Sequence, residues 1–232
     1  MNVFIATVND GYAVLGSEES WHCARVLRAR SGSLVGLIDG AGNFYEGKLE
    51  TVSDKKCTAV IIKGPVPQPR RNYYLHVAVS PTKQIDRIEW MVEKAVETGV
   101  DEISFITSKN SERTSLKRER MMKIVESAVK QSLQASIPKV NELLPVKNMF
   151  ELSGYDQKLI AHCFDLPKKS IREISFSNKK SLVLVGPEGD FTVQEVQDAA
   201  KHNFNAVSLG RNRLRTETAG LYVCLAASIL SE

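Results

Sequence analysis

Hydrophobic and polar residues alternate through the first part of the chain, which is the pattern of strands that bury one face. Four segments show it, and they are residues 3–7, 33–39, 44–52 and 57–63. Between the second and third of them, the sequence DGAGN provides residues that tolerate a positive φ, which suits a hairpin. Residues 17–28 are predicted to form one helix with Ser17 as its N-cap. This part of the chain is therefore predicted to be a small β domain.

A proline-rich break ends that pattern. The sequence GPVPQP at residues 64–69 holds three prolines, which neither continue a helix nor pair regularly in a sheet. We place a domain boundary there. The predicted domains are a β domain over residues 1–69 and a second domain over residues 70–232.

Strand-like and helical segments alternate in the second domain. The strand-like segments are residues 74–80, 102–108, 158–163, 181–186 and 206–210. The helical segments are residues 83–98, 115–135, 192–201 and 217–230. Such alternation predicts an α/β fold in which helices cover both faces of a parallel sheet. Ligands of these sheets bind beyond the carboxyl ends of the strands, so chemistry is expected in the loops after Val185 and Leu209.

The composition is that of an ordinary globular protein, with 43% hydrophobic and 25% charged residues. No apolar run is long enough to span a membrane, and the first residues lack the pattern of a secretory signal, so we expect a cytoplasmic protein. The four cysteines form no CxxC pair, and we expect them to be reduced and buried, without a disulfide framework or a metal site. The net charge of +4 is too small to indicate a nucleic-acid partner by itself.

The segment LVLVGPEGDFT at residues 182–192 has the pattern of a buried strand that runs into a tight loop and then a helix. Thr192 and Glu195 fit a capping box at the start of that helix. The two glycines allow a flat ligand to approach the backbone, and Glu188 places a carboxylate at the end of the strand. An ordinary structural turn accounts for the spacing equally well. The loop has neither a Walker motif nor a GxGxxG fingerprint, so nucleoside triphosphate chemistry is not expected.

A second loop follows the last strand-like segment. Its sequence, SLGRNRLRTETAG at residues 208–220, contains three arginines within five residues and leads into an apolar helix. Thr216 is a candidate cap of that helix. A solvated basic loop has the same features, so this loop indicates a ligand site only in combination with the first one.

In combination, the GPEGD loop and the SLGxxxLRTETA loop, separated by one helix and one strand, resemble the SPOUT methyltransferases. The resemblance is closer to the RsmE family, which methylates N3 of a uridine in 16S ribosomal RNA, and it extends across nearly the whole chain. Further segments support it, namely WHCARVLR at 21–28 with Asp39-Gly40, KAVETGV at 94–100, SER at 111–113 and ESAVKQS at 126–132. One departure is Leu133-Gln134, where the family often has Arg or Lys.

The resemblance implies a SPOUT-type parallel sheet with a C-terminal trefoil knot, preceded by a small PUA-like β-barrel domain that binds RNA. Periodicity alone does not predict a knot, because knots are rare. The resemblance also implies S-adenosyl-L-methionine as cofactor, 16S rRNA within the 30S subunit as partner, and a homodimer formed through helices beside the knot. The apolar helix at 221–230 is a candidate dimer interface, and an intrachain core helix is the alternative.

The family binds the adenine largely through backbone groups of the knotted loops, and the end of an earlier strand borders the methionine part. Carried over to this sequence, the cofactor-binding residues are Ala161, His162, Val185, Gly186, Pro187, Glu188, Gly189, Leu209, Gly210, Leu214, Arg215, Thr216, Glu217, Thr218 and Ala219. We expect His162 to form a wall of the pocket rather than to act as a base, because a lone histidine at a strand end has no visible partner.

Methyl transfer to uracil N3 requires chiefly that the enzyme position the nucleophile and remove its proton, because a sulfonium methyl is already a strong electrophile. The candidate catalytic residues are Arg215, which would stabilise the developing uracil anion, and Glu188, which would accept or relay the proton. Glu217 is a second candidate carboxylate. The alternatives are structural, with Arg215 paired with Glu217 and Glu188 satisfying backbone donors of the knot.

RNA binding requires side chains that neutralise phosphates, and residues 109–120 are the most basic stretch, with five basic residues against two acidic ones. A solvated loop and helix start is the alternative. The predicted RNA contacts are Arg25, Arg28, Lys83, Arg87, Lys109, Arg113, Lys117, Arg118 and Arg120. Since N3 is hidden in a base pair, the target base must leave its partner, and a folded ribosomal subunit is the expected substrate.

Two other functions stay open on the sequence alone. One is a SPOUT methyltransferase that acts on a different RNA, because the cofactor loops determine the chemistry more firmly than the target. The other is an RNA-binding assembly factor without catalysis, which the intact GPEGD and LRTETA sequences disfavour.

Overall fold

The computed structural model describes residues 1–231, and Glu232, the last residue of the predicted second domain, lies outside the described residues. The chain divides into two compact units. One consists of Met1–Arg70 and Glu126–Ile137, and the other of Arg71–Val125 and Pro138–Glu232. No helix in the described part of the chain is long and apolar enough to cross a membrane.

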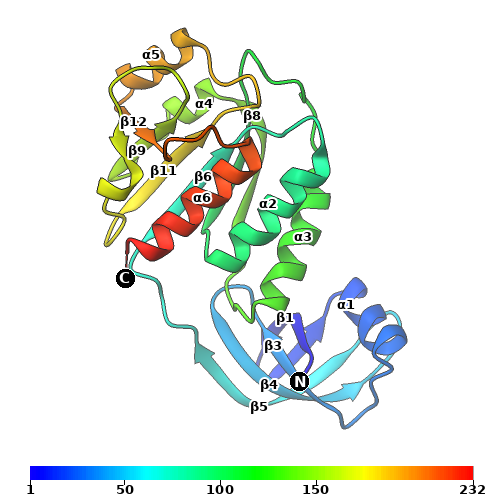
Figure 1. Ribbon diagram of the computed structural model, residues 1–232. Coiled ribbons are helices and arrows are strands. Elements are labelled where there is room, and N and C mark those ends of the chain that lie inside the picture. The colour runs from blue at the N-terminus through cyan, green and yellow to red at the C-terminus, as the bar shows by residue number, and fades with distance from the viewer. Residues whose placement is uncertain (232) are drawn as a thin grey trace. The chain divides into compact units, whose positions relative to one another are not determined.

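The first unit contains a closed five-stranded barrel, drawn in blue and cyan in Figure 1. Its strands follow the order β1-β2-β5-β4-β3, and they are β1 (Val3–Asn9), β2 (Tyr12–Leu15), β3 (Leu34–Ile38), β4 (Asn43–Thr51) and β5 (Thr58–Pro67). Neighbouring strands are antiparallel except β1 and β3, whose parallel pairing closes the barrel. Inward-pointing residues such as Phe4, Leu37 and Leu49 are buried in its core. The β domain expected from the alternating pattern is confirmed, although β2 was not predicted.

The predicted helix over residues 17–28 is corrected. An α-helical segment, α1 (Ser17–Trp21), continues as a π-helical turn, η1 (His22–Val26). Ser17 is the first residue of α1 rather than its cap. The N-cap is Gly16, which has an extended backbone and no side chain to bond the first turn.

The predicted break at residues 64–69 is also corrected, because β5 runs to Pro67, which pairs with Asn43 of β4. The prolines are tolerated because this ladder is irregular. The register between β4 and β5 shifts near Phe44, where the residues opposite need not all donate a backbone hydrogen bond.

The barrel unit also includes Glu126–Ile137, a segment distant in sequence. The N–H of Ala135 donates to Oε1 of Gln68 at 2.6 Å. The departure from the family pattern lies here, in the turn after α3 (Arg118–Gln131): Leu133 is exposed with a left-handed φ of 53°, and Gln134 is buried. These residues therefore form a turn of the barrel unit.

The second unit is built on a seven-stranded parallel sheet with the order β10-β12-β9-β11-β6-β7-β8. Its strands are β6 (Tyr74–Val79), β7 (Glu102–Thr107), β8 (Lys139–Pro145), β9 (Gln157–Ala161), β10 (Lys169–Ser170), β11 (Lys180–Val185) and β12 (Phe204–Ser208). The five predicted strands are all present. β8 and β10 were not predicted, because β8 has one buried residue among seven and β10 is only two residues long.

Helices pack against both faces of this sheet (Figure 1). Besides α3, they are α2 (Ile85–Thr98), α4 (Lys147–Phe150), α5 (Val193–Lys201), α6 (Thr216–Ile229) and the 3₁₀ turn η2 (Ile171–Glu173). On one face α4 and α5 pack on Leu182 and Leu184 of β11. On the other, α6 lies against α2, with Gly220 beside Met91. The predicted fold class, a barrel followed by a helix-covered parallel sheet, is confirmed.

The helix predicted over residues 83–98 also packs as expected. In α2 the residues at three- and four-residue spacing are buried, namely Ile88, Met91, Val92, Ala95 and Val96. Gly99 ends the helix with φ of +95°, a left-handed conformation that favours glycine.

The order of the last strands brings distant segments together. β9 lies between β11 and β12, and the chain then returns as α6, which contacts β6 and β11. The carboxyl ends of β9, β11 and β12 therefore meet at one edge, where Ala161 pairs in register with both Val185 and Val207. The trefoil knot itself stays a prediction.

Candidate active site

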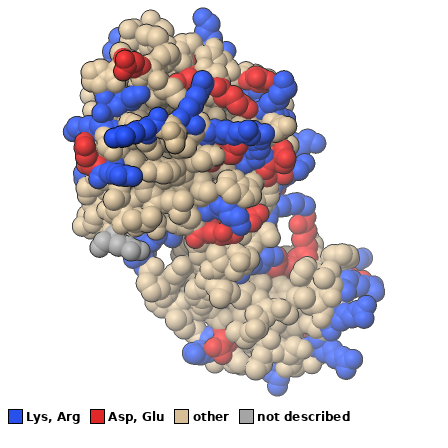
Figure 2. All heavy atoms as spheres, in the orientation of Figure 1, with Lys and Arg blue, Asp and Glu red and all other residues tan. Residues whose placement is uncertain are grey.

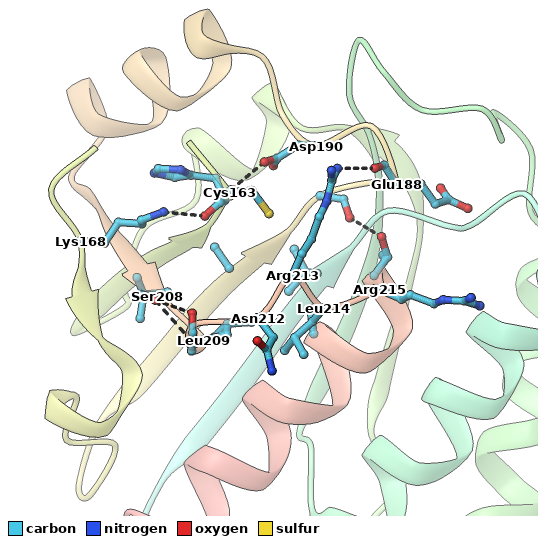
Figure 3. A pocket seen from close by; sticks show the side chains of 18 of the residues that line it. Cys163, Lys168, Glu188, Asp190, Ser208, Leu209, Asn212, Arg213, Leu214 and Arg215 are labelled. Carbon is cyan, nitrogen blue, oxygen red and sulfur yellow. Dashed lines mark hydrogen bonds between the residues drawn. The ribbon is translucent and has the colours of Figure 1, made fainter. Parts of the chain in front are cut away.

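A cavity of about 450 Å³ lies at this edge of the sheet (Figure 3). The residues that line it come from the ends of three strands, the loops that follow them and the start of α6. They are Ala161, His162, Cys163, Lys168, Val185, Gly186, Pro187, Glu188, Asp190, Val207, Ser208, Leu209, Gly210, Arg211, Asn212, Arg213, Leu214, Arg215, Thr216 and Ala219. The cavity is where the sequence placed the chemistry, beyond the carboxyl ends of parallel strands.

The loop after β11 is a tight turn that small residues and one strained residue make possible. A Cβ on Gly186 would lie 3.1 Å from the ring of the buried Phe191, so the close approach requires glycine. Asp190 has a left-handed φ of 63°, and its N–H donates to the Pro187 carbonyl at 2.9 Å. Its Oδ2 accepts from the N–H of Cys163 at 2.7 Å, which ties this loop to the end of β9.

The helix after this loop begins as predicted. Thr192 and Glu195 form a capping box: the Thr192 hydroxyl accepts from the Glu195 N–H at 3.2 Å, and the Glu195 carboxylate accepts from the Thr192 N–H at 2.7 Å. The capping box fixes where the loop ends and α5 starts.

The loop between β12 and α6 is held against the first loop by two hydrogen bonds. The Thr216 hydroxyl donates to the Gly186 carbonyl at 2.9 Å, and Arg213 donates from Nη2 to the Glu188 carbonyl at 3.2 Å. The predicted capping role of Thr216 is wrong: the N-cap of α6 is Arg215, and the Thr216 side chain bonds the other loop instead. The two motifs singled out in the sequence thus form one cavity wall.

The two candidate catalytic side chains lie on the same side of these loops. Figure 3 shows Glu188 and Arg215 both extending away from Lys168 and Ser208. The Glu188 carboxylate accepts a hydrogen bond from the backbone N–H of Lys83 at 3.0 Å, so it does satisfy a backbone donor. The exposed Arg215 guanidinium has no hydrogen-bond or ionic partner among residues 1–231. A positive and a negative group therefore flank one region of the surface.

The structural alternative for Arg215, a pairing with Glu217, is not formed. Glu217 is buried, and its Oε1 lies 3.7 Å from Nη1 of Arg87, in the first turn of α2. Glu217 is consequently not a lining residue of the cavity, and neither is the exposed Thr218 on α6. Gly189 also lies outside the wall, because it faces Asn110 on the other side of the loop.

His162 lies in the cavity wall with 7% of its surface exposed. Neither ring nitrogen has a hydrogen-bond partner in the described part of the chain, and the ring centroid is 5.6 Å from that of Phe164. Burial lowers the pKa of His162, the nearby Lys168 lowers it further, and Asp190 opposes them. The imidazole is therefore held neutral within the wall.

Several lining residues were not predicted, namely Cys163, Lys168, Asp190, Val207, Ser208, Arg211, Asn212 and Arg213. Lys168 comes from the loop after β9, where no motif stands, and it donates to the His162 and Phe164 carbonyls at 3.1 and 2.7 Å. Asp190 could have been found, since it ends the GPEGD motif. Cys163 corrects a second expectation: all four cysteines are free, but this one is exposed.

The predicted RNA-contacting side chains fall into two groups. Six have protein partners: Arg25 with Asp54, Lys83 with Glu112, Arg87 with Glu217, Arg113 with the Thr82 and Lys83 carbonyls, Arg118 with the Val140 carbonyl, and Arg120 with Glu89. Arg28, Lys109 and Lys117 are exposed, with no side-chain partner within residues 1–231. These three are free to meet phosphates without losing an existing contact.

Basic side chains also surround the cavity. Figure 2 shows Lys and Arg gathered over the part of the sheet unit where Figure 1 places the loop before α6. That loop contains Arg211, Arg213 and Arg215. No cluster of three or more metal-ligating side chains occurs among the residues that the structure describes.

The family models that match the chain cover both units. An RNA methyltransferase domain matches residues 69–228, and an RNA methyltransferase PUA domain matches residues 15–62. The second match agrees with the PUA-like barrel expected from the resemblance.

Related proteins match over most of their length. A ribosomal RNA small subunit methyltransferase E from Mesomycoplasma hyopneumoniae is 33% identical over 186 residues, covering 78% of this chain and 79% of the relative. The crystal structure of a probable rRNA-methyltransferase from Porphyromonas gingivalis is 37% identical with a TM-score of 0.90, covering 100% of this chain and 98% of that one.

A third relative is a ribosomal RNA small subunit methyltransferase E from Neisseria gonorrhoeae, solved bound to S-adenosyl methionine. It is 26% identical with a TM-score of 0.87, covering 99% of this chain and 98% of that one. The two family models cover the sheet unit, which holds the two cavity loops, and the barrel. The chain belongs to the ribosomal RNA small subunit methyltransferase E family of RNA methyltransferases.

Proposed function

We propose that this protein is an S-adenosylmethionine-dependent methyltransferase that methylates N3 of a uridine in 16S rRNA of the small ribosomal subunit, working in the cytoplasm. The observation that carries the proposal is the cavity formed by the GPEGD and LRTETA loops, with Glu188 and Arg215 on one side of it. The relatives' names supply the substrate class, and the Neisseria gonorrhoeae relative supplies the cofactor.

The cavity fits the proposed cofactor in size and lining. Its volume of about 450 Å³ lies in the usual range for small-molecule sites, roughly 300–1,000 Å³. Its apolar side chains provide the flat walls that an adenine ring requires, and they are Val185, Val207, Leu209, Leu214 and Ala219. When bound, S-adenosylmethionine supplies a methyl group on a positively charged sulfur, which is already electrophilic.

We divide the predicted cofactor contacts into residues that line the cavity and residues that lie behind its wall. Twelve of the fifteen are lining residues, and the assignment to the cofactor rests on that position. Gly189, Glu217 and Thr218 would act from behind the wall, by supporting the loop or the first turn of α6.

The chain's own groups then have to activate N3. Its proton must leave as N3 attacks the methyl carbon, and negative charge develops on the uracil ring and its oxygens. Arg215, always positively charged and without an acidic partner in the described part of the chain, stabilises that charge by hydrogen bonds and Coulomb attraction. Glu188 accepts the proton, while the Lys83 N–H fixes the direction of its carboxylate.

The two units take separate tasks in this proposal. The barrel domain, residues 1–69, binds RNA through Arg25 and Arg28, and residues 70–232 hold the cofactor and the reacting base. Remaining RNA contacts come from the sheet unit, where Lys109 and Lys117 are the predicted contacts without a side-chain partner in the described part of the chain. An unpaired uridine within the assembled 30S subunit is the substrate, because only an unpaired base exposes N3.

We further propose that the enzyme is a homodimer that pairs through α6 and α2. One face of α6 is buried inside the unit by Val223, Cys224 and Ala227. Large apolar side chains stay exposed on the two helices, and they are Leu225, Ile229 and Trp90. A second copy that covers them would remove apolar surface from water.

Transfer of labelled methyl from S-adenosylmethionine to 30S subunits that lack the modification, followed by nucleoside analysis, tests the function. We expect 3-methyluridine as the product. A different methylated nucleoside would assign the enzyme another RNA position. Absence of both transfer and cofactor binding would favour a non-catalytic assembly factor and contradict the proposal.

A further inference from the structure

Residues 108–113 lie directly against the cofactor loop, on the side away from the cavity. The exposed side chain of Asn110 donates from Nδ2 to the carbonyls of Gly189 and Asp190, both at 3.1 Å. A Cβ on Gly189 would lie 3.0 Å from the Cβ of Asn110, so the two segments are in van der Waals contact without a water layer between them.

A second contact fixes the same segment to the helix that follows the loop. The Glu195 carboxylate uses Oε2 to accept from the Thr192 N–H and hydroxyl at 2.7 and 3.0 Å, which caps α5. Its Oε1 accepts from the backbone N–H of Lys109 at 2.9 Å. Lys109 and Asn110 therefore hold the turn at residues 189–192 at both of its ends.

This turn leads straight to the cavity. Asp190, whose carbonyl Asn110 holds, lines the cavity and has a strained left-handed backbone. Its carboxylate also accepts a hydrogen bond from the N–H of Cys163, another residue that lines the cavity. A displacement of Asn110 would consequently move two parts of the cavity wall.

The same segment carries a cation that is free to meet RNA. Lys109 has no side-chain partner among the described residues. Close by, the ion pair between Lys83 and Glu112 joins side chains that are 76% and 53% exposed, at 3.0 Å. Exposed pairs contribute little to stability, so a phosphate group can replace Glu112 as the partner of Lys83 at small cost.

We propose that Asn110 is a positioning residue that couples RNA binding at residues 108–113 to cofactor binding in the adjacent cavity. The proposal rests on the proposed function. In the absence of RNA the exposed amide exchanges its two carbonyl acceptors with water. RNA bound at Lys109 holds the segment in place, so that Asn110 keeps Gly189 and Asp190 in the arrangement that binds the cofactor. By linkage, the cofactor must tighten RNA binding by the same factor.

The coupling is measured as the ratio of two dissociation constants. Equilibrium dialysis gives the Kd of radiolabelled S-adenosylhomocysteine, which cannot transfer a methyl group, with and without saturating unmodified 30S subunits. We expect the subunits to lower this Kd about fivefold in the wild type, the lower end of typical allosteric couplings. In Asn110→Ala we expect the ratio to fall to about one, because the amide that transmits the contact is gone.

Three comparisons make the result specific. Asn205→Ala removes an exposed amide on β12, away from the loop, and is expected to keep the wild-type ratio. Asn110→Asp keeps the size of the side chain but replaces the donor with an acceptor facing two carbonyls, and it is expected to lose the coupling as Ala does. The thermal unfolding midpoint of each variant shows that the fold is retained.

The outcomes that overturn the proposal are distinct from those that overturn the function. A wild-type enzyme that methylates 30S subunits but binds S-adenosylhomocysteine equally well with and without them has no coupling, and the proposal is wrong while the function stands. An Asn110→Ala variant that keeps the wild-type ratio, or weakens both constants equally, makes Asn110 only structural. A wild-type protein that neither binds S-adenosylhomocysteine nor transfers methyl groups overturns both.

Discussion

The guanidinium of Arg87, in the first turn of α2, lies 3.7 Å from the carboxylate of Glu217, in the first turn of α6. Glu217 is buried, and a buried carboxylate without a partner is costly, so the contact with Arg87 offsets part of that cost. Because Glu217 contacts Arg87, its carboxylate does not pair with Arg215, as the sequence alone would have allowed. Arg215 is thereby left available for the substrate, two residues from an acid that would otherwise neutralise it.

Arg215→Ala is therefore expected to lower kcat by about 100-fold, as removal of one group that stabilises developing charge commonly does. Arg215→Lys keeps the charge but loses the planar set of donors, and we expect it to recover only part of the rate. Single-turnover methylation of 30S subunits measures the effect. Arg211→Ala, at an exposed arginine of the same loop, is the matched control, and an equal loss there would attribute the effect to the total charge of the loop.

Glu188→Gln is expected to separate catalysis from loop structure. The amide carbonyl of glutamine still accepts the hydrogen bond that the Lys83 N–H donates at 3.0 Å, so the loop keeps its contact. The amide cannot accept a proton, and we expect kcat to fall by about 100-fold while cofactor affinity stays within a factor of about two. Methyl transfer at wild-type rate by this variant would exclude Glu188 as the proton acceptor.

The fold could be predicted from the sequence where each element carries its own pattern. The apolar runs that became β6, β7 and β11 are buried on both faces, so they stand out from the polar loops around them. β8 was missed because, as an edge strand, it buries only Val140 and shows no such run, and β10 is only two residues long. The last strand of the barrel was predicted to end at residue 63 rather than at Pro67, because the prolines of β5 were taken to exclude pairing that an irregular ladder allows.

Of the residues that line the cavity, the sequence could predict chiefly those that belong to the two motifs. Lys168 enters the wall because β9 lies between β11 and β12, an order that no local pattern encodes. The partners of charged side chains could not be predicted from the sequence either. Arg120 and Glu89 are 31 residues apart, and their contact depends on how α3 packs against α2. The sequence identifies which side chains are cations, but only the structure shows which of them already have a protein partner.

Lys117→Ala is expected to weaken RNA binding and reduce its salt dependence. A lysine that neutralises one phosphate contributes a slope of about −0.7 to −0.9 in log K against log salt concentration, so the variant should lose about one unit of slope. Arg120→Ala serves as the control, because Arg120 already donates to Glu89 at 2.8 Å and its loss removes less free charge. Filter binding to 30S subunits over a salt series gives both slopes, and identical slopes in the two variants would contradict the assignment.

Gly186→Ala is expected to destabilise the sheet unit and to abolish cofactor binding. The added Cβ would lie 3.1 Å from the Phe191 ring and 3.3 Å from its backbone nitrogen, and the buried ring has no room to retreat. Overpacking of this kind typically costs about 1–3 kcal/mol. Gly16→Ala meets no atom within 4 Å and controls for the substitution itself. Denaturant unfolding and dialysis with S-adenosylhomocysteine measure the two effects, and an unchanged Gly186→Ala variant would show that the loop moves freely.

Stability is expected to fall on acidification between about pH 6.5 and pH 4 because of His76. Its ring is 1% exposed and bonded to Tyr155 and Ser104 at 2.6 and 2.7 Å, and burial lowers the pKa of His76 from 6.5 to about 4, against the attraction of Glu102. The unfolded chain therefore binds this proton first, so the neutral ring contributes its full stability above pH 6.5 and loses it as pH falls toward 4.

The predicted loss is about 3 kcal/mol at most, from 1.36 kcal/mol per pKa unit. Urea unfolding at a series of pH values measures it. His76→Gln cannot titrate there, and its stability should vary less with pH in this window, with a remainder from His162, whose pKa is also lowered by burial. Burial would raise the pKa of Glu102, but hydrogen bonds from Lys139 and other neighbours lower it to about 2. The stability that Glu102 contributes is therefore lost at lower pH, between about 4.5 and 2. His22→Gln, at an exposed histidine, controls for the loss of a histidine as such, and a slope in His76→Gln equal to that of the wild type would exclude the buried ring as the cause.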